Sequence, residues 1–221
     1  MNVEYIVERI RNWCDCDNCP LKKRNIPLVF IPQRRVETMV ITEGPNRVEE
    51  PNFITSLANH PTYTFLYTLF SGNFVPDGEK ATAYWTHVRK CFIKSRKGEP
   101  VVKGENLKNV EKKALNICSK AYLKSEIECI NPKLILAVGE QAKDFFVKNG
   151  DDRLRGRLEA VFEKQIRNKS IFRDLRISKE VTVELAVVPH PSGLNRFWNK
   201  PIGGTQNILE MIRKEITRTV E

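Results

Sequence analysis

The chain has 221 residues, of which 41% are hydrophobic, which is enough for one α/β domain with a sizeable core. Glycine and proline are scattered, which excludes collagen-like and low-complexity classes, and no apolar run approaches the roughly 20 residues of a membrane span. Lys and Arg number 37 against 27 Asp and Glu, a net charge of +10. This surplus favours a polyanionic partner such as nucleic acid, although a merely soluble basic protein would show it too.

The first residues predict a helix over 2–13, with Val3, Ile6, Val7 and Ile10 on one face. Charged and apolar residues alternate there, so the segment lacks the apolar core of a signal peptide. We therefore expect an intracellular, cytoplasmic protein, in which disulfides are rare.

Alternating strands and helices predict the fold class. Strands are expected over 38–42, 82–88, 134–138 and 181–188, and helices over 62–70, 106–128, 140–148 and 205–220. The charged residues 94–104 indicate an exposed loop, and the basic residues 153–176 carry only a weak pattern. This order predicts a single domain over residues 1–221, a three-layer α/β/α sandwich around a mainly parallel four-stranded sheet.

Three of the predicted strands end in polar chemistry. Glu43–Asn46 follows the first strand, His87 closes the second, and His190–Asn195 follows the last. Ligands of such sheets bind beyond the carboxyl ends of the strands, so these loops are expected to converge on one crevice.

Six cysteines in an intracellular chain suggest metal or cluster ligation. Cys16 and Cys19 have a common metal-binding spacing. Cys118 and Cys129 are 129 − 118 = 11 residues apart and share one face of the predicted helix, so both could be ligands or one could be core. Four thiolates could hold zinc or an iron–sulfur cluster equally well.

The motifs together resemble the uracil-DNA glycosylase superfamily, family 4 in particular. Cys16-Asp-Asn-Cys19-Pro-Leu is similar to its CxxCPL opening, and Thr42-Glu-Gly-Pro-Asn46 to its GEAPG loop. Four further segments match in the same order. Glu49–Phe53 resembles the family's stretch that ends in a Pro-Phe pair, and Thr86–Cys91 resembles TNVVKC. Asn131–Gly139 resembles the KPKVIVALG strand, and His190–Asn195 resembles the His-Pro-Ser loop.

The resemblance implies a 4Fe-4S cluster held by Cys16, Cys19, Cys91 and Cys118, with zinc as the alternative occupant. Cys118 is chosen over Cys129 because it precedes Pro132 by about the interval usual in the family. Cys14 and Cys129 would then be bystanders.

The resemblance also implies roles at the crevice. Glu43 would orient or activate the attacking water, and His190 would donate a hydrogen bond to the departing base. The alternative for His190 is a histidine that caps a turn. The base would be bound by Gly44, Pro45, Asn46, Phe53 and His87, and the DNA strand by Ser192, Gly193, Leu194 and Arg196.

Two residues depart from the family pattern. Gly44 stands where the best-known members have a catalytic aspartate, and His87 stands where family 4 has a base-reading asparagine. Phe53, matched to the aromatic side chain that stacks on the base, could instead be an ordinary core residue.

The expected function is a monofunctional glycosylase of base excision repair that acts, as a monomer, on DNA containing a damaged base, uracil first. Two alternatives stay open. One is a different specificity, such as hypoxanthine, and the other is an iron–sulfur DNA-binding protein that has lost catalysis.

Overall fold

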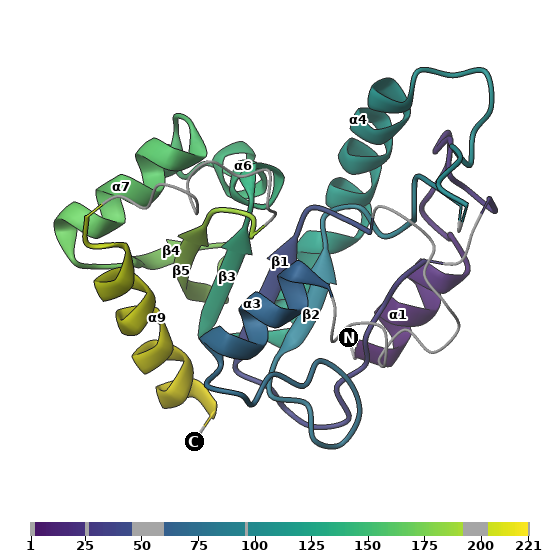
Figure 1. Cartoon of the computed structure of the whole chain (residues 1–221). Coiled ribbons are helices and arrows are strands. Elements are labelled where there is room, and N and C mark those ends of the chain that lie inside the picture. Colours follow the sequence, from purple (N-terminus) through teal and green to yellow (C-terminus); the bar gives the residue numbers. More distant parts are fainter. Residues whose placement is uncertain (1–2, 25–26, 46–59, 96, 192–202, 221) are drawn as a thin grey trace.

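A computed structural model describes residues 3–24, 27–45, 60–95, 97–191 and 203–220. Its centre is a five-stranded sheet in the order β2-β1-β3-β5-β4 (Figure 1). β2, β1, β3 and β5 run parallel, and β4 pairs antiparallel with β5 at the edge. The strands are β1 (Thr38–Thr42), β2 (Tyr84–His87), β3 (Leu134–Val138), β4 (Phe172–Arg176) and β5 (Thr182–Val188).

Helices occupy most of the connections between the strands. They are α1 (Val3–Arg11), α3 (Pro61–Leu69), α4 (Leu107–Cys118), α5 (Lys124–Ile130), α6 (Glu140–Lys148), α7 (Leu158–Asn168) and α9 (Thr205–Val220). A π-helical segment, η1 (Ser119–Leu123), joins α4 to α5, and a 3-10 turn, η2 (Asp152–Leu154), precedes α7. None of the helices in these described ranges is long and apolar enough to cross a membrane.

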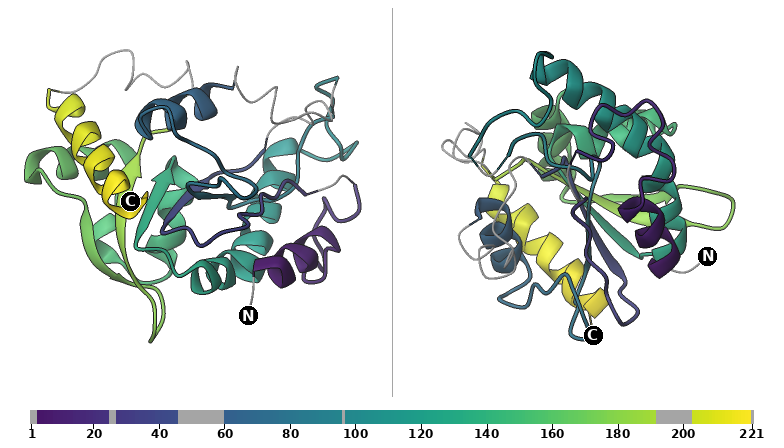
Figure 2. Two further views of the ribbon diagram at one scale, coloured as in Figure 1. Left: turned by 90° about the horizontal axis from the view of Figure 1, so that it is seen from below. Right: turned by 90° about the vertical axis from the view of Figure 1, so that its right-hand side faces the viewer.

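The strands bury both faces, which gives three layers. Along β3, Leu134, Leu136 and Val138 pack with α3 and α9, whereas Ile135 and Ala137 pack with α5 and α6. This alternation follows from the period of two in a strand, and both sets are apolar because helices cover both faces. Figure 2 shows the blue α3 and yellow α9 on one side of the strands and the purple α1 on the other. The α/β/α prediction is confirmed.

The sheet has one strand more than predicted. The weakly patterned residues 153–176 contain η2, α7 and β4. β4 has the burial pattern buried–exposed–exposed–buried–exposed, because its register with β5 shifts between Phe172 and Leu175. An irregularity of this kind breaks the alternation that identifies a strand in a sequence.

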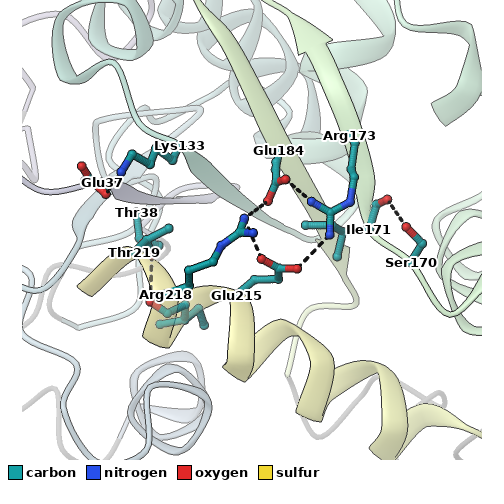
Figure 3. A network of polar contacts seen from close by, with 11 residues as sticks. Glu37, Thr38, Lys133, Ser170, Ile171, Arg173, Glu184, Glu215, Arg218 and Thr219 are labelled. Atoms are coloured by element: carbon teal, nitrogen blue, oxygen red, sulfur yellow. Dashed lines mark hydrogen bonds and ion pairs between the residues drawn. The ribbon is translucent and has the colours of Figure 1, made fainter. Parts of the chain in front are cut away.

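Charged side chains form a network of ion pairs between β4, β5 and α9 (Figure 3). Arg173 on β4 and Arg218 on α9 each contact both Glu184 on β5 and Glu215 on α9. These ion pairs connect the antiparallel edge strand to the last helix.

A third apolar cluster lies beside the sheet and joins α1, the cysteine turn and α4. It contains Ile6, Ile10, Cys16, Cys19, Leu21, Cys91, Ile93, Val102, Val110, Ala114 and Tyr122. The N-terminal segment therefore packs against the residues that follow β2.

Candidate active site

The carboxyl ends of four strands meet at one edge of the sheet, as predicted. Thr42 and His87 are register partners at the ends of β1 and β2. The amide of Gly139, after β3, donates to the carbonyl oxygen of Val188 at the end of β5. A Cβ atom built on Gly139 would lie 3.6 Å from Cβ of His190. Glu43, His87 and His190 therefore lie at the carboxyl ends of parallel strands, with β3 between the strands of Glu43 and His190.

All three histidines of the chain gather at this edge. Burial lowers the pKa of His87 and of His190, and the charge of His60 lowers both pKa values further. His190 Nε2 lies 3.3 Å from Oγ1 of Thr62, near the start of α3. Because their pKa values are lowered, the imidazoles of His87 and His190 are neutral at neutral pH, and each can donate one hydrogen bond.

His60 belongs to this group, although its sequence context indicated only a loop residue. It is the N-cap residue of α3, followed by Pro61. Proline at the first helical position marks the start of a helix, and this signal places His60 at the helix terminus. Only the packing of α3 on the sheet brings it to the other histidines.

The two ring nitrogens of His87 have different surroundings. Its exposed fraction is 4%, and its Nδ1 lies 2.5 Å from Oγ1 of Thr42. The indole Nε1 of Trp85 donates to the same hydroxyl over 3.2 Å. Within the described part of the chain, Nε2 of His87 has no hydrogen-bond partner. A buried polar atom without a partner costs stability, so its retention points to a ligand.

A buried ion pair fixes the backbone at His87. Lys90 Nζ donates to the His87 carbonyl over 2.6 Å, to Thr86 Oγ1 over 2.6 Å and to Glu126 Oε2 over 2.5 Å. Glu126 also accepts from Tyr84 and Thr86. All three ammonium hydrogens are used, which satisfies the condition under which a buried charge is tolerated.

Glu43 is a partly buried carboxyl group at the end of β1. Burial raises its pKa, and the nearby Glu111 raises it further, whereas Arg89 opposes the shift. A carboxylate with a raised pKa is a stronger base than one in water.

Gly44 has no room for a side chain. A Cβ atom there would lie 2.8 Å from the carbonyl oxygen of Arg89. Arg89 is itself buried, and its Nη1 donates to the carbonyl oxygens of Pro45, at 2.7 Å, and of Cys91. An aspartate therefore does not fit at position 44 of this backbone.

Four cysteines come together at the third cluster: Cys16, Cys19 and Cys91 belong to it, and Cys118 contacts Cys16. Hydrogen bonds from the thiols of Cys118 and Cys19 lower the pKa of Cys16, whose Sγ lies 3.4 Å from the hydroxyl of Tyr122. Cys118 and Cys19 each interact with both Cys16 and Cys91. The set is buried, with exposed fractions of 2–8%.

The remaining two cysteines lie elsewhere. Cys14 is exposed, and Cys129 is partly exposed beside Glu4 and Glu126. Across the described ranges, no three or more His, Cys, Asp or Glu side chains are arranged to hold a metal ion.

Six of the predicted site residues lie outside the described residues: Asn46, Phe53, Ser192, Gly193, Leu194 and Arg196. The described part of the candidate site thus consists of Glu43, Gly44, Pro45, His60, His87 and His190.

A family model decides the relationship. The model of the Uracil DNA glycosylase superfamily matches residues 30–214, which include every strand of the sheet and most of α9. The chain belongs to the uracil-DNA glycosylase superfamily. The match begins after Cys16 and Cys19, so membership does not rest on the cysteine turn. A comparison with curated proteins gives no significant match.

Proposed function

We propose that this superfamily member is a DNA glycosylase of base excision repair that hydrolyses the N-glycosidic bond of a flipped, deaminated base, uracil first. The observation that supports it is the meeting of Glu43, His87 and His190 at one sheet edge, with two imidazoles kept neutral by burial. A flipped base would be read by one histidine while the other stabilises its departure.

His190 supplies leaving-group stabilisation. Negative charge develops on the base oxygen as the C–N bond breaks, and a neutral imidazole can donate a hydrogen bond to it. A preorganised donor of this kind commonly contributes about 3 kcal/mol to transition-state stabilisation. Thr62, at 3.3 Å from Nε2, orients the ring in the free protein.

Glu43 supplies the base that orients or activates water. The water oxygen bonds to C1′ of the sugar as the C–N electron pair leaves with the base, which gives a free base and an abasic strand. Gly44 has no side chain and cannot activate water. Among the residues of this loop that the structure describes, only Glu43 has a carboxylate that can do so.

The cysteine set fits an iron–sulfur cluster by its chemistry, and we propose that Cys16, Cys19, Cys91 and Cys118 hold a 4Fe-4S cluster, with zinc as the alternative. When bound, such a group would cross-link the cysteine turn, the segment after β2 and α4. Arg89 connects this region to the catalytic loop, because it binds the carbonyls of both Cys91 and Pro45. The cluster's proposed role is structural.

A second candidate function is DNA binding without catalysis. It is favoured by Gly44, which removes the catalytic aspartate found in other members of the superfamily. Glu43 and the neutral His190 favour catalysis instead.

The test is base release from oligonucleotides that carry uracil, hypoxanthine or xanthine, in single strands and duplexes, followed by alkaline cleavage at abasic sites. Cleavage at uracil supports the proposal, and cleavage at another lesion alone would reassign the substrate. Binding of every oligonucleotide without cleavage would favour the non-catalytic candidate.

A further inference from the structure

The hydrogen bonds around His87 determine which ring nitrogen carries the proton. The indole N–H of Trp85 can only donate, and it donates to Oγ1 of Thr42. The hydroxyl hydrogen of Thr42 can therefore be donated to an acceptor. The two candidates are His87 Nδ1 at 2.5 Å and the carbonyl oxygen of Thr86 at 3.5 Å. Hydrogen bonds weaken steeply at the longer distance, so Nδ1 accepts and the proton of the neutral ring lies on Nε2.

We infer that His87 is a fixed hydrogen-bond donor that selects bases with a carbonyl on their Watson–Crick edge, and that Thr42 and Trp85 are the positioning residues that fix it. The inference rests on the proposed function. Nε2 is on the opposite side of the ring from Thr42, is buried, and has no partner among the described residues. Its hydrogen therefore has no acceptor among the described residues, and a base that reached this position would supply one.

A fixed donor distinguishes a deaminated base from the amine-bearing base that it came from. Deamination turns the exocyclic amine of cytosine or adenine into the carbonyl of uracil or hypoxanthine, so a hydrogen-bond donor becomes an acceptor. Against Nε2–H, the undamaged base presents a second donor, and the pair repels. The deaminated base completes the hydrogen bond. Uracil and hypoxanthine both offer the carbonyl that this donor needs. Thymine and guanine offer one too, so His87 separates carbonyl from amine, and other contacts must exclude the undamaged carbonyl bases.

Burial and nearby positive charges keep the His87 imidazole neutral. Burial lowers the pKa of His87 well below its ordinary value, and the charges of Lys90, Arg89 and His60 lower it further. The imidazole therefore does not gain a second proton at neutral pH, and Nδ1 stays an acceptor for Thr42.

The first experiment measures the tautomer in the whole protein without DNA. In long-range ¹⁵N–¹H spectra of protein labelled with ¹⁵N-histidine, wild type is expected to show His87 as the Nε2–H tautomer. Thr42→Val keeps the shape and removes the donor, so it is expected to give a mixture of tautomers. The matched control, Thr42→Ser, keeps the hydroxyl and the Nε2–H form. An Nδ1–H tautomer in wild type would overturn the inference.

The second experiment measures selection. Release of uracil is compared with release of 2-pyrimidinone, which lacks the O4 carbonyl, and the preference for uracil is expected to fall about tenfold in Thr42→Val but not in Thr42→Ser. An unchanged preference in Thr42→Val would overturn the inference while the proposed function stands. No release of any base would instead overturn the proposed function, and with it the selective role of His87.

Discussion

Glu43 and Gly44 show how one residue can limit the chemistry of its neighbour. Gly44 lies against the backbone of Arg89, and any side chain would have to displace it. The guanidinium of Arg89 in turn lowers the pKa of Glu43, against the opposing effects of burial and Glu111. The carboxylate that we propose as catalytic is thus one position earlier than in the best-known members of the superfamily, in surroundings that raise its pKa.

The pH dependence of base release tests this role of Glu43. Only the ionised carboxylate can accept a proton, so the rate is expected to rise with pH through an apparent pKa above that of an ordinary glutamate. Glu43→Gln is expected to lose at least about 100-fold in rate and to lose this acid limb. Rates are measured under single turnover from pH 4 to 8.

The matched control is Glu159→Gln, which alters an exposed carboxylate on α7. It is expected to keep both the rate and the pH profile. A Glu43→Gln variant with the wild-type profile would show that another group limits the rate at low pH.

The sequence predicts residues for the site chemistry but not the contacts that these residues make. Glu43, His87 and His190 follow from strand ends, since the carboxyl edge of a parallel sheet collects ligand-binding groups. The contribution of His60, the contact of Gly44 with Arg89 and the Thr42–His87 hydrogen bond depend on tertiary packing between segments distant in sequence. Local patterns do not contain that information.

At the scale of elements, the π-helical segment separates two cysteines that a regular helix would align. The sequence predicts one helix over 106–128, whereas η1 interrupts it between Cys118 and Cys129. Cys118 is buried and contacts Cys16, whereas Cys129 is partly exposed near Glu4. π-Helical turns insert a residue and rotate the face that follows, so periodicity alone could not separate the two thiols.

The cysteine variants test this assignment. Cys118→Ala is expected to lose visible absorbance and bound iron, because one ligand of the proposed cluster is gone. Cys129→Ala serves as the control and is expected to keep both. Elemental analysis of the wild type distinguishes the metals, since zinc without visible absorbance would replace the cluster by the alternative occupant. Loss of iron only in Cys129→Ala would reverse the assignment of the fourth ligand.

The edge strand β4 marks where element prediction fails. Its bulge removes the alternation of buried and exposed side chains, although Phe172 and Leu175 still pack in the core and the backbone pairs with β5. Ion pairs of Arg173 with Glu184 and Glu215 add surface contacts. The buried parallel strands carry long apolar runs and are recognisable from the sequence. β4 depends on partners that lie 11 and 42 residues away.

At the scale of the whole molecule, the net charge of +10 favours association with a polyanion. Affinity for a duplex is expected to fall at least tenfold between 50 and 200 mM salt, because each phosphate that the protein neutralises releases a counterion. Titrations by fluorescence anisotropy measure the slope of log affinity against log salt concentration. A flat dependence would make the surplus charge incidental to DNA binding.

The central claim is that Glu43, His87 and His190, at the carboxyl ends of the strands, form a site that breaks a glycosidic bond. The most direct measurement is single-turnover release of free uracil from an oligonucleotide, detected by mass spectrometry, with wild type and His190→Ala at saturating protein. The account predicts free uracil and an abasic strand from wild type, and a rate at least about 100-fold lower from His190→Ala with nearly unchanged DNA affinity. No free uracil from wild type, or equal rates from both proteins, would contradict it.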